Sequence, residues 1–348
     1  MLRKLLLLVV GIVGILVVAG VVVIDMFRER LSLPHRGYVT AEVFVDVRSG
    51  DSSRLIAKRL ADAGVVRDDL TFRLAVWQLG LARSLQAGEY HFDRSMSALE
   101  VADQISRGRV YLRSITFPEG LTIEEMAAVF HNQPFGSYDD FLAAAQRVEL
   151  VADLDTSARN LEGYLFPETY ALPRDATAED LVEAMVLQFR QVFTDALRAE
   201  ARLRELTIRE VVTLASLIQK ETGRLDEHAL VSAVYTNRLR IGMPLQCDPT
   251  VIYGLQLDGL YDGNLTRENL RHDSSYNTYV YGGLPPGPIA APGRQALEAV
   301  FKPADVSYLY FVSRNDGTHE FANTLREHNR NVQRYQVRRL GRLRSERQ

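Results

Sequence analysis

The sequence is poor in cysteine and lacks the motifs of several large enzyme classes. Its 348 residues contain one cysteine, Cys247, which excludes an intrachain disulfide and a C-x-x-C zinc site. Neither H-E-x-x-H nor G-x-x-x-x-G-K-[ST] occurs, which argues against a zincin protease and a P-loop nucleotide enzyme. Lysine and arginine number 41 against 44 aspartate and glutamate, so the basic excess typical of nucleic-acid binders is missing. We therefore expect no metal, no cofactor and no nucleic-acid partner.

What the chain does contain is an ordinary globular composition. Apolar residues make up 47 % and charged residues 24 %, which excludes a fully disordered or collagen-like chain. At roughly 150 residues per domain, the length predicts about two domains. We expect an α+β protein with these segments: a cytoplasmic N-terminus (1–4), a transmembrane anchor (5–24), a linker (25–40), a small module (41–113), a larger domain (114–340) and a basic tail (341–348).

Residues 5–24 form an uncharged apolar run. Twenty helical residues span about 30 Å, the thickness of a bilayer core. Arg3 and Lys4 precede the run, whereas the charges that follow it balance, so the positive-inside rule places the body of the chain outside the cytoplasm. A cleavable signal peptide is the alternative, but its apolar region is usually shorter and ends in a small-x-small site. We expect an uncleaved, single-pass inner-membrane anchor and a periplasmic body.

The small module begins with a predicted strand at 43–47 and a Gly-Asp-Ser turn into a helix with Leu55, Ile56, Leu60 and Ala63 on one face. A helix over 69–79 and a strand at 88–92 follow, and Ser97 with Glu100 predicts a capping box. The order of strand, helix, helix and strand resembles a LysM-like module, which implies binding of N-acetylglucosamine polymers such as peptidoglycan. A spacer that binds nothing is the alternative.

The larger domain reads as mostly helical. The sequence predicts a strand over 110–117, and helices begin at the capping box Thr122–Glu125 and at Tyr138. Helical periodicity continues from Glu179 to about Leu206. Two strands at 308–312 and 319–322 flank Asn-Asp-Gly, a hairpin turn signal.

One glutamate stands out in this domain. Another capping box, Thr207–Glu210, begins a helix in which Glu221 shares the apolar face with Leu214, Leu217 and Ile218. An apolar surrounding and the negative end of the helix dipole both favour the protonated acid, which is the form a general acid needs. The alternatives are a frayed helix end that exposes Glu221 to water, or an ion pair with an arginine.

Loops after this helix are dense in polar, aromatic and glycine residues that suit sugar hydroxyls, acetamides and pyranose faces. We expect the catalytic residue to be Glu221. The residues expected to bind substrate are Glu162, Tyr164, Gln246, Asp248, Tyr276, Asn277 and Tyr279.

Six motifs in order resemble the MltG (YceG-like) family of endolytic murein transglycosylases. They lie at 162–170 (EGYLFPETY), 214–222 (LASLIQKET), 237–243 (NRLRIGM), 248–254 (DPTVIYG), 276–279 (YNTY) and 283–289 (GLPPGPI). The family's catalytic glutamate is the second acid of an E-K-E-T run, which falls on Glu221, while Gln219 replaces the first acid.

The resemblance implies a lysozyme-like glutamate on a helix and cleavage of the bond between N-acetylmuramic acid and N-acetylglucosamine in nascent glycan, with 1,6-anhydromuramic ends. One acid can serve both proton transfers in that reaction. The expected partners are glycan strands, the inner membrane and synthases of the elongation machinery. Two alternatives remain: a hydrolase in which Asp248 or Glu162 activates water, and a peptidoglycan-binding scaffold without activity.

Overall fold

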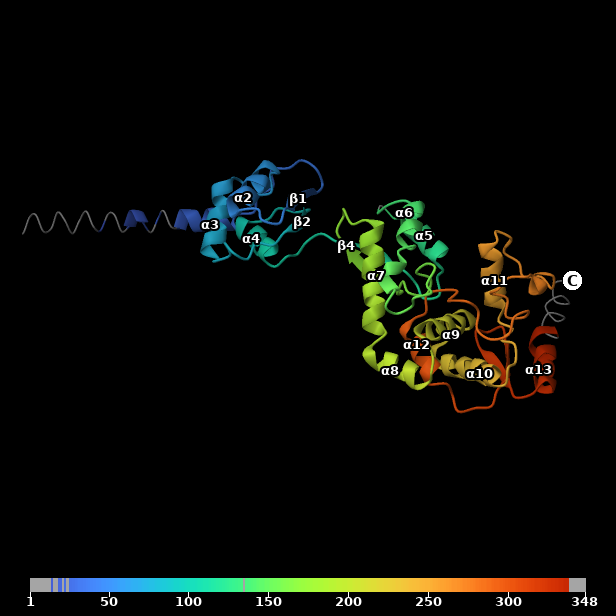
Figure 1. Ribbon diagram of the computed structural model, residues 1–348. Helices are drawn as coiled ribbons and strands as arrows, with labels where there is room; N and C mark the ends of the chain where they lie inside the picture. The colour runs from blue at the N-terminus through green and yellow to red at the C-terminus, as the bar shows by residue number, and fades with distance from the viewer. Residues whose placement is uncertain (1–13, 15–17, 21, 23–24, 134, 338–348) are drawn as a thin grey trace, which may run out of the picture. The chain divides into compact units, whose positions relative to one another are not determined.

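The computed structural model describes residues 14, 18–20, 22, 25–133 and 135–337. The predicted anchor at 5–24 lies mostly outside the described residues, as does the predicted basic tail. Among the helices that are described, none is long and apolar enough to cross a membrane. The chain divides into two compact units, whose elements are labelled in Figure 1: one runs to Arg113 and includes 171–174, and one contains the remainder from Ser114 onward.

Unit 1 is built around a two-stranded antiparallel sheet. Its elements are β1 (Val43–Val47), α2 (Ser53–Asp62), α3 (Asp69–Gln78), β2 (Gly88–Phe92) and α4 (Ala98–Ser106). Strand β1 pairs with β2 in antiparallel register, Val45 opposite Tyr90. Both strands, the two intervening helices and the capping box at Ser97 confirm the sequence predictions. Two side chains at the centre of the core, Leu60 and Phe72, are fully buried.

Three local predictions for unit 1 and its end were wrong. Leu55 is 40 % exposed because it lies about 140° around the helix from the buried Leu60. Residues 25–32, expected to be a linker, are helical, and Leu31 is buried in the unit's core. The strand expected over 110–117 is confined to β3 (Arg113–Thr116), which pairs with β4 (Thr169–Leu172).

Unit 2 is mostly helical. Its α-helices are α5 (Ile123–His131), α6 (Tyr138–Ala144), α7 (Ala178–Val192), α8 (Asp195–Leu203), α9 (Ile208–Glu221), α10 (His228–Arg240), α11 (Asp248–Leu257), α12 (Arg294–Phe301) and α13 (Leu325–Val332). Short 3-10 turns occupy Val148–Val151, Leu225–Glu227 and Asn269–Arg271, and a π-helical turn covers Gln333–Val337. The helical period predicted from Glu179 to Leu206 is interrupted, because Thr194 caps a new helix after α7 ends.

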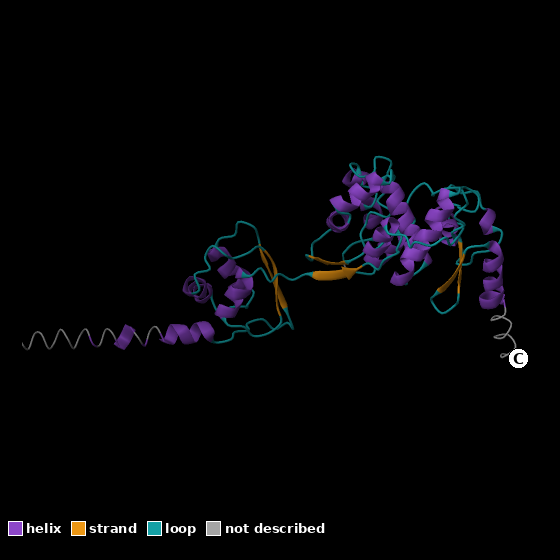
Figure 2. Cartoon of the chain, turned by 90° about the horizontal axis from the view of Figure 1, so that it is seen from below, coloured by secondary structure: helices purple, strands orange, loops and turns teal. Residues whose placement is uncertain are grey.

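Helix α9 lies at the centre of unit 2. It packs against α10, α11 and α12, and eight consecutive residues from Val211 to Ile218 are buried. The predicted hairpin is present as β5 (Tyr310–Ser313) and β6 (His319–Ala322), in antiparallel register beside α13. Figure 2 shows these strands as a short pair among helices. This packing places the carboxyl end of α9 among α10, the start of α11 and the β5–β6 hairpin.

Candidate active site

Glu221 is the last residue of α9. The helix begins at the predicted capping box, in which Thr207 and Glu210 bond each other's backbone N–H. The three apolar residues expected on the glutamate's face, Leu214, Leu217 and Ile218, are buried, whereas Glu221 itself is half-buried. An acid is thus held at the end of a buried helix, with its carboxyl at the edge of the apolar interior.

Two side chains from other elements bond the Glu221 carboxyl. The Tyr235 hydroxyl on α10 donates to Glu221 Oε1 at 2.5 Å. The thiol of Cys247, the residue before α11, forms a second hydrogen bond with the same carboxyl. Both partners are at most 1 % exposed. The carboxyl is therefore fixed in direction by neighbours that are themselves immobilised in the core.

Burial raises the pKa of the Glu221 carboxyl above its ordinary value. The hydrogen bonds from Tyr235 and Cys247 lower this pKa, and the negative charge of nearby Asp248 raises it. The net direction is upward, which favours the protonated acid that the apolar helix face predicts. No arginine or lysine forms an ion pair with Glu221 among the described residues, so this environment supports the acid interpretation of the pattern.

A polar loop surrounds the start of α11. Asp248 is exposed, and the Tyr279 hydroxyl donates to its Oδ1 at 2.6 Å. Gln246 is exposed in the left-handed region with φ of 49°, because the chain turns there to bury Cys247. Thr278 closes the turn by accepting from the Cys247 N–H at 2.9 Å. Gln246, Asp248 and Tyr279 thus come from segments near Glu221.

The remaining predicted residues gather elsewhere. Glu162 is 6 % exposed, and its Oε2 accepts from the Ile123 N–H and from the Tyr253 hydroxyl, both at 3.2 Å. Burial raises the pKa of Glu162 to about 7. It borders a cavity of about 400 Å³ together with Ser157, Arg159, Asn160, Tyr164, Arg209, Leu257, Tyr276, Pro286, Gly287 and Pro288.

Two predicted substrate contacts are buried braces in the structure. Asn277 is fully buried, and its amide donates to the carbonyls of Leu270 and His272. Tyr164 is 1 % exposed and donates to Asp155 Oδ2 at 2.8 Å. The side chain of Asn277 has no exposed surface here, so its contact with substrate stays a prediction. Sequence reasoning also missed Tyr235, since no local pattern connects a tyrosine on the next helix with Glu221.

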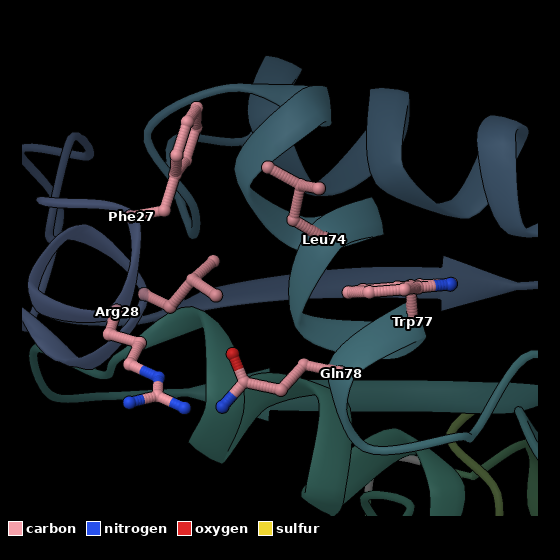
Figure 3. A pocket seen from close by; sticks show the side chains of 6 residues that line it. Phe27, Arg28, Leu74, Trp77 and Gln78 are labelled. Atoms are coloured by element: carbon pink, nitrogen blue, oxygen red, sulfur yellow. The ribbon is translucent and has the colours of Figure 1, made fainter. Parts of the chain in front are cut away.

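A second cavity lies in unit 1 and is mostly apolar. It has a volume of about 420 Å³ and is bordered by Leu31 and, as labelled in Figure 3, by Phe27, Arg28, Leu74, Trp77 and Gln78. No acid or base pair lines it. Within the described part of the chain, no group of three or more His, Cys, Asp or Glu side chains is arranged to hold a metal ion.

The fold and the site define a helix-rich α+β domain with a half-buried acid at a helix end. The model of the YceG-like family matches residues 45–334, and the chain belongs to that family. An endolytic murein transglycosylase of Bacillus subtilis is 33 % identical over 310 residues, covering 84 % of each chain. One of Streptococcus pneumoniae is 29 % identical over 327 residues, covering 83 % of this chain and 58 % of the relative.

Solved structures agree with this assignment. The crystal structure of a YceG-like protein from Listeria monocytogenes superposes with a TM-score of 0.57 at 30 % sequence identity. The match covers 83 % of this chain and 98 % of the other. The likeness therefore extends over both units rather than over the helical unit alone.

Proposed function

We propose that this chain is an endolytic lytic transglycosylase of peptidoglycan. It cleaves the β-1,4 bond between N-acetylmuramic acid and N-acetylglucosamine within glycan strands and leaves 1,6-anhydromuramic ends. Family membership and the names of the relatives support the substrate and the reaction class. The observation that carries the proposal is Glu221, a half-buried acid whose pKa is raised and whose direction Tyr235 fixes.

In the proposed mechanism, Glu221 acts first as an acid and then as a base. The protonated carboxyl gives its proton to the glycosidic oxygen as the bond from that oxygen to muramic C1 breaks. The resulting oxocarbenium-like or oxazolinium species is attacked at C1 by the C6 hydroxyl of the same sugar. The Glu221 carboxylate takes the hydroxyl proton as the new bond forms, which restores the acid. No water is consumed, so no second catalytic carboxylate is required.

Gln246, Asp248 and Tyr279 are the proposed substrate contacts, because they are at least partly exposed and lie on segments near Glu221. A hydrolase is the second candidate, favoured by one observation: Asp248 is close enough for its charge to raise the pKa of Glu221. Glu162 is a poor activator of water, because it is buried and already accepts from Ile123 and Tyr253.

We further propose that unit 1 is a LysM-like module that binds glycan. The observed order β1, α2, α3, β2 with antiparallel strands supports this interpretation. Residues 5–24 are proposed to anchor the chain in the inner membrane, with the N-terminus cytoplasmic and the catalytic unit periplasmic. In that position the enzyme would act on newly made strands and meet the synthases that elongate them.

Digestion of un-crosslinked glycan by the purified chain tests the proposal. Wild type should produce fragments of intermediate length early, whereas Glu221→Gln should be inactive. Glu268→Gln, which alters an exposed glutamate near α11, is the matched control and should behave as wild type. Equal digestion by Glu221→Gln and wild type would contradict the proposal, and inactivity of all three proteins would favour the scaffold.

A further inference from the structure

A second carboxylate and a histidine are paired beside the end of α9. Glu227, which is 6 % exposed, accepts from the backbone N–H of His319 at 2.8 Å. Its Oε2 lies 2.7 Å from Nδ1 of the His319 ring, whose side chain is 12 % exposed. Because a carboxylate can only accept, Nδ1 carries the hydrogen. Two hydrogen bonds to one carboxylate therefore fix both the backbone and the ring of His319.

This pair is tied to the residue that follows Glu221. The Thr222 hydroxyl donates to the same Glu227 Oε2 at 3.1 Å. The Thr222 carbonyl lies 3.2 Å from Nε2 of His228, a histidine that is 2 % exposed. Thr222, Glu227 and His319 thus form a continuous network that begins one residue after the candidate acid.

An aromatic ring lies between His319 and Tyr235. The ring of Phe311 on β5 packs edge-on against His319, with centroids 5.5 Å apart, and against Tyr235 at 6.1 Å. Tyr235 in turn donates to Glu221. His319 is therefore connected to the candidate acid in two ways. Glu227 links it to Thr222, the residue that follows Glu221, and the Phe311 ring links it to Tyr235.

We propose that His319, oriented by Glu227, is a positioning residue for Glu221 that stabilises the carboxylate left after the first proton transfer. The inference deepens and rests on the proposed function, and neither residue was among the predicted site residues. A glutamate that must act as acid and then as base needs an environment that tolerates both forms. Burial favours the neutral acid, and a nearby imidazolium offsets this by favouring the anion.

The electrostatics agree with the geometry. The positive charge of His319 lowers the pKa of Glu221, whereas Asp248 raises it. The titratable or charged side chains around Glu221 are Tyr235 and Arg238 on α10, Cys247 and Asp248 at the start of α11, Tyr279 on the following loop, and His319 on β6. His319 is the histidine among them, so its removal takes away the positive charge that favours the Glu221 anion.

The test compares two substitutions of one residue. His319→Asn retains a side-chain N–H that can donate to Glu227 but carries no charge, whereas His319→Ala loses both. His272→Asn is the matched control, because His272 also pairs with a carboxylate, Asp258 at 2.6 Å, in unit 2. Measurements are kcat and kcat/KM against pH on un-crosslinked glycan, with the melting temperature of each variant.

We expect His319→Asn to keep the wild-type melting temperature and to lower kcat about 10- to 100-fold, because a charge that supports the Glu221 anion is lost. The alkaline limb of kcat/KM should move to higher pH, because Glu221 without the cation keeps its proton longer. His272→Asn should match wild type. A His319→Asn protein with wild-type kcat and an unmoved alkaline limb would assign a structural role and overturn the inference.

Two outcomes separate this inference from the function on which it rests. If wild type is inactive on glycan, the proposed function fails first. If Glu221→Gln is inactive while His319→Asn behaves as wild type, only the inference fails. If His319→Asn does not fold, Glu227→Gln is measured in the same assays. Its amide oxygen still accepts from His319, but the negative charge that orients the ring is lost. Failure of both variants to fold would assign the pair to stability and overturn the inference.

Discussion

Glu162 and Glu221 lie on opposite sides of helix α9. Gly163 fits closely against Val212, and Val212 precedes Glu221 by two and a half helical turns. The pKa of both carboxyls is raised by burial. Their neighbours differ, however: Glu162 is an internal acceptor behind a cavity, whereas Glu221 sits beside an exposed polar loop. The two acids should therefore respond differently to the same substitution.

Glu221→Gln should reduce the rate by at least about 10²–10⁴-fold, the share of a general acid. Its melting temperature at neutral pH should equal or exceed that of wild type. The folded state binds the extra proton because the folded pKa is above the unfolded one, so this contribution to stability is complete below the unfolded pKa and is lost as pH rises through the folded pKa. Glutamine has no proton to lose, so the variant does not lose this stability as the pH rises. Calorimetry and a digestion assay on the same preparation check this, and unfolding of the variant at neutral pH would instead mark Glu221 as structural.

Tyr235→Phe should move the alkaline limb of the pH–rate profile to higher pH. The hydrogen bond from Tyr235 lowers the pKa of Glu221, so its loss raises that pKa. We expect a rate loss of about 10- to 100-fold, since a hydrogen bond to a charged group contributes about 1.5–3 kcal/mol. Tyr281→Phe removes a comparable bond to Asp273 on an exposed loop and should leave the profile unchanged. Identical profiles for both variants would argue against this account.

Glu162→Gln should alter stability more than catalysis. The pKa of Glu162 is about 7 in the folded protein, above its unfolded value. Its contribution to the free energy of unfolding is therefore full below about pH 4.5 and is lost as pH rises toward and through 7. Relative to wild type, the free energy of unfolding of the variant should therefore rise by about 3 kcal/mol between pH 4 and pH 8. Denaturant titrations at both pH values measure this, and a pH-independent difference would refute it.

The Cys247 thiol should not react with an alkylating reagent in the native protein. It is fully buried, and burial raises its pKa well above the ordinary value, so the reactive thiolate is scarce. Labelling should begin only in denaturant, in step with global unfolding. Rapid labelling of the native protein would show that the segment carrying Gln246 and Asp248 opens, and would contradict a Glu221 carboxyl held by a buried Cys247.

Local signals in the sequence predicted much of the fold. The capping boxes at Thr122 and Thr207 begin helices as expected, because the cap bonds involve only neighbouring residues. The hairpin at β5 and β6 follows from its Asn-Asp-Gly turn. Periodicity failed where a cap interrupted an apolar pattern, as at Thr194. The sequence of residues 25–32 shows no helical period, so their helix was not predicted. The helix is stabilised by Leu31, which packs in the core of unit 1.

The site was only partly accessible from the sequence. Helical spacing placed Glu221 on an apolar face, since one helix determines that face. Its partners Tyr235 and Cys247 come from segments joined only by tertiary packing, so no spacing rule connects them. The same limit applies to Asn277: the folded loop directs its side-chain amide to the backbone carbonyls of Leu270 and His272, which no spacing rule indicates.

The measurement that tests the central claim most directly is mass spectrometry of the products from un-crosslinked glycan. A transglycosylase that uses Glu221 alone should leave 1,6-anhydromuramic ends from wild type and no product from Glu221→Gln. A hydrolase that uses Asp248 as a second carboxylate would leave reducing ends heavier by one water, about 18 Da, because water is added to C1. Anhydro ends that require Glu221 are the predicted result, and reducing ends formed by wild type would contradict it.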